Sequence, residues 1–167
     1  AQYIEMIRQS GDVLLELINT ILDLSKIEAG MLHIQEVVFE PEKILTRKHS
    51  IFQNQMKSEH IEFLLEYDHD IPQYLKGDTT RIRQVLSNFL SNAFKFTEKG
   101  HVNLKAELIK QTKKYATLKM SVEDTGHGIP DKDQAQIFQK FIQVLEHLRP
   151  DLHGTGLGLN ICKSLIE

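Results

Sequence analysis

Asparagine and lysine recur at helical spacing in one stretch of this sequence, at Asn88, Asn92 and Lys95. At about 100° per residue these side chains fall within a narrow arc of a helix, and apolar residues cover the opposite side. Most polar helix faces are simply solvated, but asparagine is a weak helix former, so two of them one turn apart favour a functional face. Amide oxygens suit Mg²⁺, which takes most of its ligands from phosphates and water, and Lys95 would place a positive charge against a phosphate oxygen. The pattern therefore predicts a site for a phosphorylated ligand and its magnesium ion.

A second block reads Asp-Thr-Gly-His-Gly over residues 124–128 and follows a segment that is predicted to be a strand. The carboxylate of Asp124 would accept a hydrogen bond from an exocyclic amine such as adenine N6, and Gly126 and Gly128 would let the backbone approach the ring closely. The alternative is an ordinary turn at a strand end, where Asp and Gly are common. The spacing of this block alone leaves both interpretations open.

In the third block Gly154, Gly156 and Gly158 alternate directly before an apolar helical run. Free backbone amides at a helix N-terminus bind phosphate, and glycines remove side chains that would block the approach. The block is not a Walker A loop, because the Lys-Ser/Thr pair is missing, and no βαβ unit surrounds it as in a dinucleotide fold. A glycine-rich linker is the alternative interpretation.

The segment over residues 142–153 separates the second and third blocks, and its irregular sequence is typical of a lid beside a ligand site. Phe138 and Phe141 come directly before it. We expect these two residues to anchor the base of the lid by burying their rings.

The elements that must position these blocks follow from hydrophobic periodicity and from cap and turn residues. Helices are predicted over residues 3–29, 41–57 and 79–96, and strands over residues 32–39, 60–67, 102–108 and 118–122. This order predicts an α+β fold, a two-layer α/β sandwich with a mixed sheet and helices on one face, preceded by one long helix. The apolar face of the long helix is wide, which favours a bundle or coiled coil over packing on its own domain.

Composition excludes several classes of protein. The 167 residues are 41% hydrophobic and carry a net charge of -3, so the chain has no basic excess for nucleic acid. It contains no run of roughly 18 apolar residues, which a membrane span needs. A single cysteine, Cys162, cannot form an internal disulfide, which favours a reducing, cytoplasmic location. The eight histidines show no metal-ligand spacing.

Taken together and in order, the blocks resemble the N, G1, F and G2 boxes of sensor histidine kinases. The matching motifs are Asn-x₃-Asn-Ala-x-Lys-Phe-Thr, Asp-x-Gly-x-Gly-Ile-Pro, Phe-x-x-Phe and Gly-Thr-Gly-Leu-Gly-Leu. Upstream, residues 18–30 resemble the second helix of the dimerisation and phosphotransfer domain of these kinases. The resemblance covers essentially the whole chain. It implies that residues 1–31 form that second helix and that residues 32–167 form the catalytic domain.

The resemblance also implies a binding site for ATP in a fold shared with DNA gyrase and MutL-type ATPases. By this resemblance Asn92 is the Mg²⁺ ligand with Asn88 beside it, Lys95 contacts phosphate, Phe96 borders the nucleotide and Asp124 binds the adenine amine. The other positions implied to contact the nucleotide are Gly126, Gly128, Ile129, Gly154, Thr155, Gly156, Leu157 and Gly158.

Sensor histidine kinases pass the γ-phosphoryl group of ATP to a histidine, and from there to an aspartate of a response-regulator receiver domain. The resemblance thus implies a transferase of two-component signalling that forms a homodimer through its N-terminal helix. The acceptor motif, His-Glu/Asp-x-Arg/Lys-x-Pro, is not in this sequence, so we predict no catalytic residue within the chain itself. We expect the chain to begin after that histidine and to end before the final strands of the sheet.

Two alternatives to a kinase stay open from the sequence. One is a nucleotide-binding dimerisation module without phosphotransfer. The other is an ATPase of the gyrase or MutL kind, which is weakened because those enzymes carry a glutamate as general base where this chain has Asn88.

Overall fold

The computed structural model describes residues 2–56, 60–142 and 156–166 of the chain. It divides into two compact units. One unit is Ile34–Ile129, and the other combines Ala1–His33 with Pro130–Glu167.

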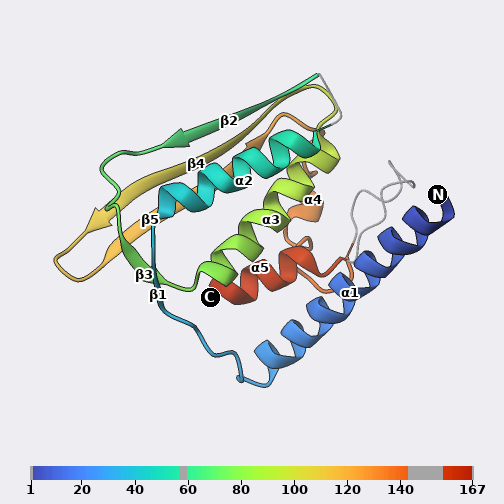
Figure 1. Cartoon of the computed structure of the whole chain (residues 1–167), viewed down its shortest axis with the longest axis horizontal. Coiled ribbons are helices and arrows are strands. Elements are labelled where there is room, and N and C mark those ends of the chain that lie inside the picture. The colour runs from blue at the N-terminus through green and yellow to red at the C-terminus, as the bar shows by residue number, and fades with distance from the viewer. Residues whose placement is uncertain (1, 57–59, 143–155, 167) are drawn as a thin grey trace. The chain divides into compact units, whose positions relative to one another are not determined.

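The unit Ile34–Ile129 is built on a mixed sheet of three strands. In this sheet β2 (Ile61–Tyr67) pairs in parallel with β4 (Gly100–Gln111), which pairs antiparallel with β5 (Ala116–Asp124). Two helices, α2 (Pro41–Gln55) and α3 (Thr79–Phe96), lie side by side over one face of the sheet (Figure 1). The predicted mixed sheet with helices on one face is therefore confirmed.

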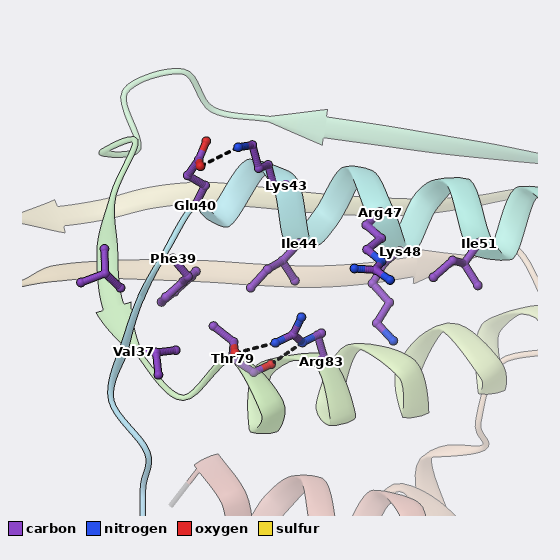
Figure 2. Close-up of a pocket in the computed structure, with 11 residues that line it drawn as sticks. Val37, Phe39, Glu40, Lys43, Ile44, Arg47, Lys48, Ile51, Thr79 and Arg83 are labelled. Carbon is purple, nitrogen blue, oxygen red and sulfur yellow. Dashed lines mark hydrogen bonds and ion pairs between the residues drawn. The ribbon is translucent and has the colours of Figure 1, made fainter.

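A short antiparallel ribbon of β1 (Val37–Phe39) and β3 (Leu75–Gly77) completes this unit. Figure 2 shows that β1 runs directly into α2 beside the first turn of α3. The strand predicted over residues 32–39 is shorter than expected, because only its last three residues pair with β3.

The hydrophobic core lies between the sheet and the two helices. Alternate residues of β4 (Val102, Leu104 and Ala106) are at most 1% exposed, as period-two alternation predicts for a strand with one buried face. From α3, Leu90 is fully buried against this layer. The core therefore fixes which side of α3 faces the sheet.

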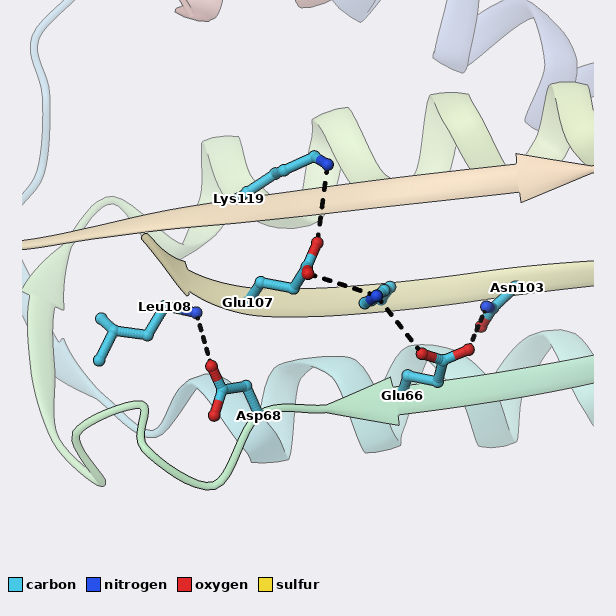
Figure 3. Close-up of polar contacts among 7 residues, drawn as sticks. Glu66, Asp68, Asn103, Glu107, Leu108 and Lys119 are labelled. Carbon is cyan, nitrogen blue, oxygen red and sulfur yellow. Dashed lines mark hydrogen bonds and ion pairs between the residues drawn. The ribbon is translucent and has the colours of Figure 1, made fainter. Parts of the chain in front are cut away.

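Charged side chains form a network on the opposite face of the sheet (Figure 3). Lys105 Nζ lies 3.6 Å from a Glu66 carboxylate oxygen and 3.3 Å from one of Glu107, and Lys119 Nζ lies 3.6 Å from Glu107. The Asn103 amide donates to Glu66 at 2.6 Å. Exposed ion pairs of this kind add little stability individually. A one-residue slip of β2 or β5 against β4 would break the contacts that cross between strands and turn the charged side chains of the slipped strand toward the core.

The second unit contains α1 (Gln2–Glu28), α4 (Asp131–Gln134) and α5 (Gly158–Ile166). The helix α1 occupies the segment where a long helix is predicted, while its place in a bundle stays a prediction. It ends in a Schellman cap, in which the Gly30 N–H donates to the Ile27 carbonyl at 3.0 Å and the Met31 N–H donates to the Lys26 carbonyl at 2.8 Å. Gly30 has φ +64°, the left-handed conformation that this cap requires. No helix in the described part of the chain is both long and apolar enough to cross a membrane.

Candidate nucleotide site

The polar face of α3 carries the first predicted block. Asn88, Asn92 and Lys95 are each half-buried, while Leu90 and Ala93 on the other side of the helix are 0% and 4% exposed. Since burial of the apolar side sets the rotation of the helix about its axis, it also orients the asparagines and the lysine.

Lys95 is partly withdrawn from water at the C-terminal end of this helix. Its Nζ lies 5.0 Å from the centre of the Phe96 ring, and burial lowers the pKa of the lysine below its ordinary value. A partly desolvated ammonium group gains more from an anionic ligand than a fully hydrated one does, because less water has to be displaced. The position therefore suits contact with a phosphate oxygen.

The second block lies against the end of α3 at Gly126. A Cβ atom at this position would sit 2.4 Å from the Phe96 carbonyl oxygen and 2.8 Å from Asp124 Oδ1, so no side chain fits. His127, which follows, places its Nδ1 3.0 Å from the same Phe96 carbonyl. The structure thus brings together the first two blocks, which are separated by strands β4 and β5 in the sequence.

Asp124, the last residue of β5, is exposed, and its conformation is fixed by its own turn. Its Oδ1 accepts a hydrogen bond from the Gly126 N–H at 2.9 Å. Gly128 has φ +69° with open space around it, so a glycine there serves the backbone conformation and not a close approach. Ile129 is 37% exposed at the end of the block. These contacts are those of a tight turn, and they leave Asp124 available to a ligand.

Thr125 and Gly100, which sequence patterns did not single out, hold this loop in place. Thr125 Oγ1 accepts a hydrogen bond from the His101 N–H at 2.9 Å, and a Cβ on Gly100 would lie 2.1 Å from that oxygen. Gly100 also has φ +112°, which only glycine adopts readily. The sequence shows only a glycine directly before the strand pattern of β4, and such glycines are too common to indicate a contact with a distant loop.

The third block belongs to the unit that contains α1 and α5, and the structure describes part of it. Gly156 has φ +66°, and a Cβ there would lie 2.7 Å from the backbone of Phe141. Leu157 is 2% exposed and packs with Leu24, and Gly158 begins α5. Gly154, Thr155 and most of the predicted lid lie outside the described residues.

The expectation that Phe138 and Phe141 bury their rings is wrong, since they are 38% and 69% exposed. Backbone hydrogen bonds hold this segment instead. The Phe141 N–H donates to the Gly156 carbonyl at 3.0 Å, and the Asn160 side chain donates to the Phe138 carbonyl at 2.9 Å.

Comparison with known proteins identifies the family of the chain. Residues 77–167, more than half of the chain, match the family described as histidine kinase-, DNA gyrase B-, and HSP90-like ATPase. The sensor protein GacS of Pseudomonas syringae pv. syringae is 41% identical over 99% of the chain, and the circadian input-output histidine kinase CikA of Synechococcus elongatus is 40% identical over 99%. The chain spans only 18% and 22% of the length of these two relatives.

Two solved structures share the fold. Full-length ShkA in complex with AMPPNP superposes with a TM-score of 0.80 at 31% identity, covering 98% of this chain and 33% of ShkA. The catalytic domain of the histidine kinase ThkA superposes with a TM-score of 0.62 at 28% identity, covering 80% of this chain and 82% of that domain. Over nearly its whole length the chain is similar to part of these sensor histidine kinases, and it belongs to the histidine kinase-, DNA gyrase B- and HSP90-like ATPase family.

Proposed function

We propose that this chain binds Mg-ATP between the polar face of α3 and the loop after β5, and presents the γ-phosphoryl group to a histidine. The observation that carries the proposal is the contact at Gly126, where the loop meets the Phe96 carbonyl with no room for a side chain. The contact holds Asp124 near the end of α3 that carries Lys95. In the proposal the carboxylate takes the adenine and the lysine takes a phosphate.

Asp124 recognises adenine in this proposal. One carboxylate oxygen is fixed by the Gly126 N–H, which orients the group so that the other can accept a hydrogen bond from the N6 amine. Phe96 borders the nucleotide, and Gly126, Gly128 and Ile129 complete the loop around the base.

The phosphates lie along α3. The amide oxygen of Asn92 would coordinate Mg²⁺ with Asn88 beside it, and Lys95 would contact a phosphate oxygen. Partly buried amides fit this ion, because Mg²⁺ takes few ligands from the protein and keeps phosphates and waters as the others. The bound ion would neutralise charge on the phosphates. Contact of the nucleotide with the third block (Gly154, Thr155, Gly156, Leu157 and Gly158) stays a prediction from the sequence motif and the resemblance alone.

Transfer of the phosphoryl group would rest on positioning and charge neutralisation, with the acceptor histidine supplied by a helix outside this chain. We infer that residues 1–31 pair with a second copy, that residues 32–167 form the catalytic domain, and that a receiver-domain aspartate takes the phosphoryl group next. We also infer a cytoplasmic location, since ATP and receiver domains are found there. An ATPase of the gyrase kind fits less well, because the amide of Asn88 cannot act as a general base.

The direct test supplies the missing acceptor. The chain is mixed with γ-labelled ATP, Mg²⁺ and a separate helical polypeptide that carries the acceptor histidine of a relative such as GacS. We expect acid-labile label on that polypeptide, and none when its histidine is replaced by glutamine. Label released only as free phosphate would support an ATPase, and ATP binding without any transfer would support a binding module.

A further inference from the structure

A cationic groove of about 500 Å³ lies between β1, α2 and α3, wholly within the unit Ile34–Ile129 (Figure 2). It is separate from the nucleotide site. At about 100° per residue, Arg83 of the groove lies on the opposite side of α3 from Asn92. The residues of the groove are therefore not part of the proposed nucleotide site.

The positive charge of the groove is only partly compensated. Four of its lining residues are basic (Lys43, Arg47, Lys48 and Arg83), and only Lys43 has an acidic partner, Glu40 at 2.6 Å. Within the described residues the other three make no ion pair. Since the whole chain has a net charge of -3, this local excess does not follow from composition.

Neutral partners hold two of these cations in place. Arg83 donates from Nε to the Thr79 carbonyl at 3.0 Å and from Nη2 to the Thr79 hydroxyl at 2.6 Å, and Lys48 donates to the Ser87 hydroxyl. Burial lowers the pKa of Lys48, and the nearby charges of Arg83 and Arg47 lower it further. Positive charges that are fixed in position and repel one another favour an anionic ligand, because its binding relieves the repulsion at little cost in side-chain entropy.

The edge of the groove has the features of a peptide-binding surface. Val37 and Val38 of β1 are 45% and 71% exposed, and Ile51 of α2 is 40% exposed. Among the described residues β1 pairs with β3 alone, so the edge beside the groove keeps its backbone groups open for a further strand. Added strands of this kind take affinity from main-chain hydrogen bonds and specificity from pockets for alternate side chains.

We propose that this groove docks an extended acidic segment of a partner protein, which adds a strand beside β1. Its carboxylates would contact Arg47, Lys48 and Arg83, and its alternate apolar side chains would cover Val37. A membrane surface fits less well, because the cations line a concave groove that a flat bilayer would not enter. A small phosphorylated compound would leave the edge of β1 unpaired.

The test uses two synthetic heptapeptides with capped ends, one alternating Glu and Val and the other alternating Lys and Val. Each is titrated into the isotopically labelled chain and followed by backbone amide shifts. We expect the acidic peptide to shift the amides of residues 37–51 and of the first turns of α3, while Asn88 and Asn92 stay unchanged and the basic peptide causes no shift.

Reversing single charges distinguishes binding in the groove from nonspecific electrostatic attraction to the chain. Arg47→Glu should weaken the acidic peptide about tenfold or more, while Lys110→Glu, the same charge change on an exposed residue outside the groove, should alter affinity less than about twofold. Equal weakening by both substitutions would overturn the proposal. It would also be overturned if the peptide did not bind and the same amides shifted only with phosphatidylserine vesicles or with pyrophosphate.

Discussion

At the scale of single residues, Gly126, Gly128 and the carboxylate of Asp124 determine the conformation of the loop after β5. Gly126 is required because the Phe96 carbonyl occupies the space of a side chain, whereas Gly128 has open space around it and is required by its backbone angle. Sequence spacing predicted that both glycines let the backbone approach a ligand. The structure assigns them different physical reasons, which pattern alone does not distinguish.

We predict that Gly126→Ala weakens ATP binding about tenfold or more, because the new methyl group must push the loop away from the end of α3. Calorimetric titration with ATP measures this. The matched control is Gly11→Ala in α1, where nothing lies within 4 Å of the added atom and φ is not positive. Alanine there should leave ATP affinity unchanged and stabilise the helix by up to about 1 kcal/mol. Equal ATP affinity in both variants would contradict the assigned contact.

At the scale of elements, α3 links the core to the site, and Asp78 fixes where it begins. Its Oδ1 accepts hydrogen bonds from the Thr80 and Arg81 N–H groups at 3.0 and 3.1 Å, as an N-cap does, and its Oδ2 accepts one from the Gln35 N–H at 3.0 Å. The bounds of the helix, residues 79–96, were predictable from local sequence. The bond to Gln35 was not, because it spans 43 residues and depends on the fold.

The pKa of Asp78 makes the stability of this unit depend on pH. Burial raises the pKa, but the backbone N–H donors outweigh it, so the pKa lies below its ordinary value. A group with a depressed folded pKa stabilises the fold above its unfolded pKa of about 3.9 and loses that contribution as pH falls through the folded pKa. The contribution should therefore be complete at neutral pH and fade in acid.

We predict that Asp78→Ala destabilises the chain by about 1 kcal/mol at pH 7, with a smaller loss at acid pH where the wild-type carboxylate is already protonated. Urea unfolding at both pH values measures the difference. Asp70→Ala serves as the control, because the carboxylate of Asp70 is exposed and caps no helix. A loss for Asp78→Ala that does not change with pH would contradict this account of the carboxylate.

At the scale of the whole molecule, α1 carries apolar side chains that the described residues leave exposed. Leu14, Ile18 and Ile21 of α1 are 58%, 45% and 51% exposed. Hydrophobic periodicity predicted both the helix α1 and its apolar face, because both follow from the spacing of residues that are close in sequence. What packs against that face is not predictable in this way, because it depends on residues distant in the sequence or in another chain.

We predict that the chain dimerises through this face and that Ile18→Glu shifts it to monomer, because a buried charge at the seam costs more than the remaining contacts supply. Sedimentation velocity at several concentrations measures the change. The adjacent Asn19→Glu is the control, since Asn19 is an exposed polar residue that lies off the predicted seam. If Ile18→Glu and the wild-type chain sedimented equally, this face of α1 would not form the dimer interface.

In the proposed complex Asp124 recognises adenine at the end of α3, and the affinity of Asp124→Asn for ATP measures this contact. Its control is Glu123→Gln, the neighbouring exposed carboxylate on β5. We predict that Asp124→Asn loses ATP binding by about a hundredfold or more, while Glu123→Gln binds like wild type and both variants unfold at the same temperature. Unchanged ATP affinity in a folded Asp124→Asn chain would contradict the site.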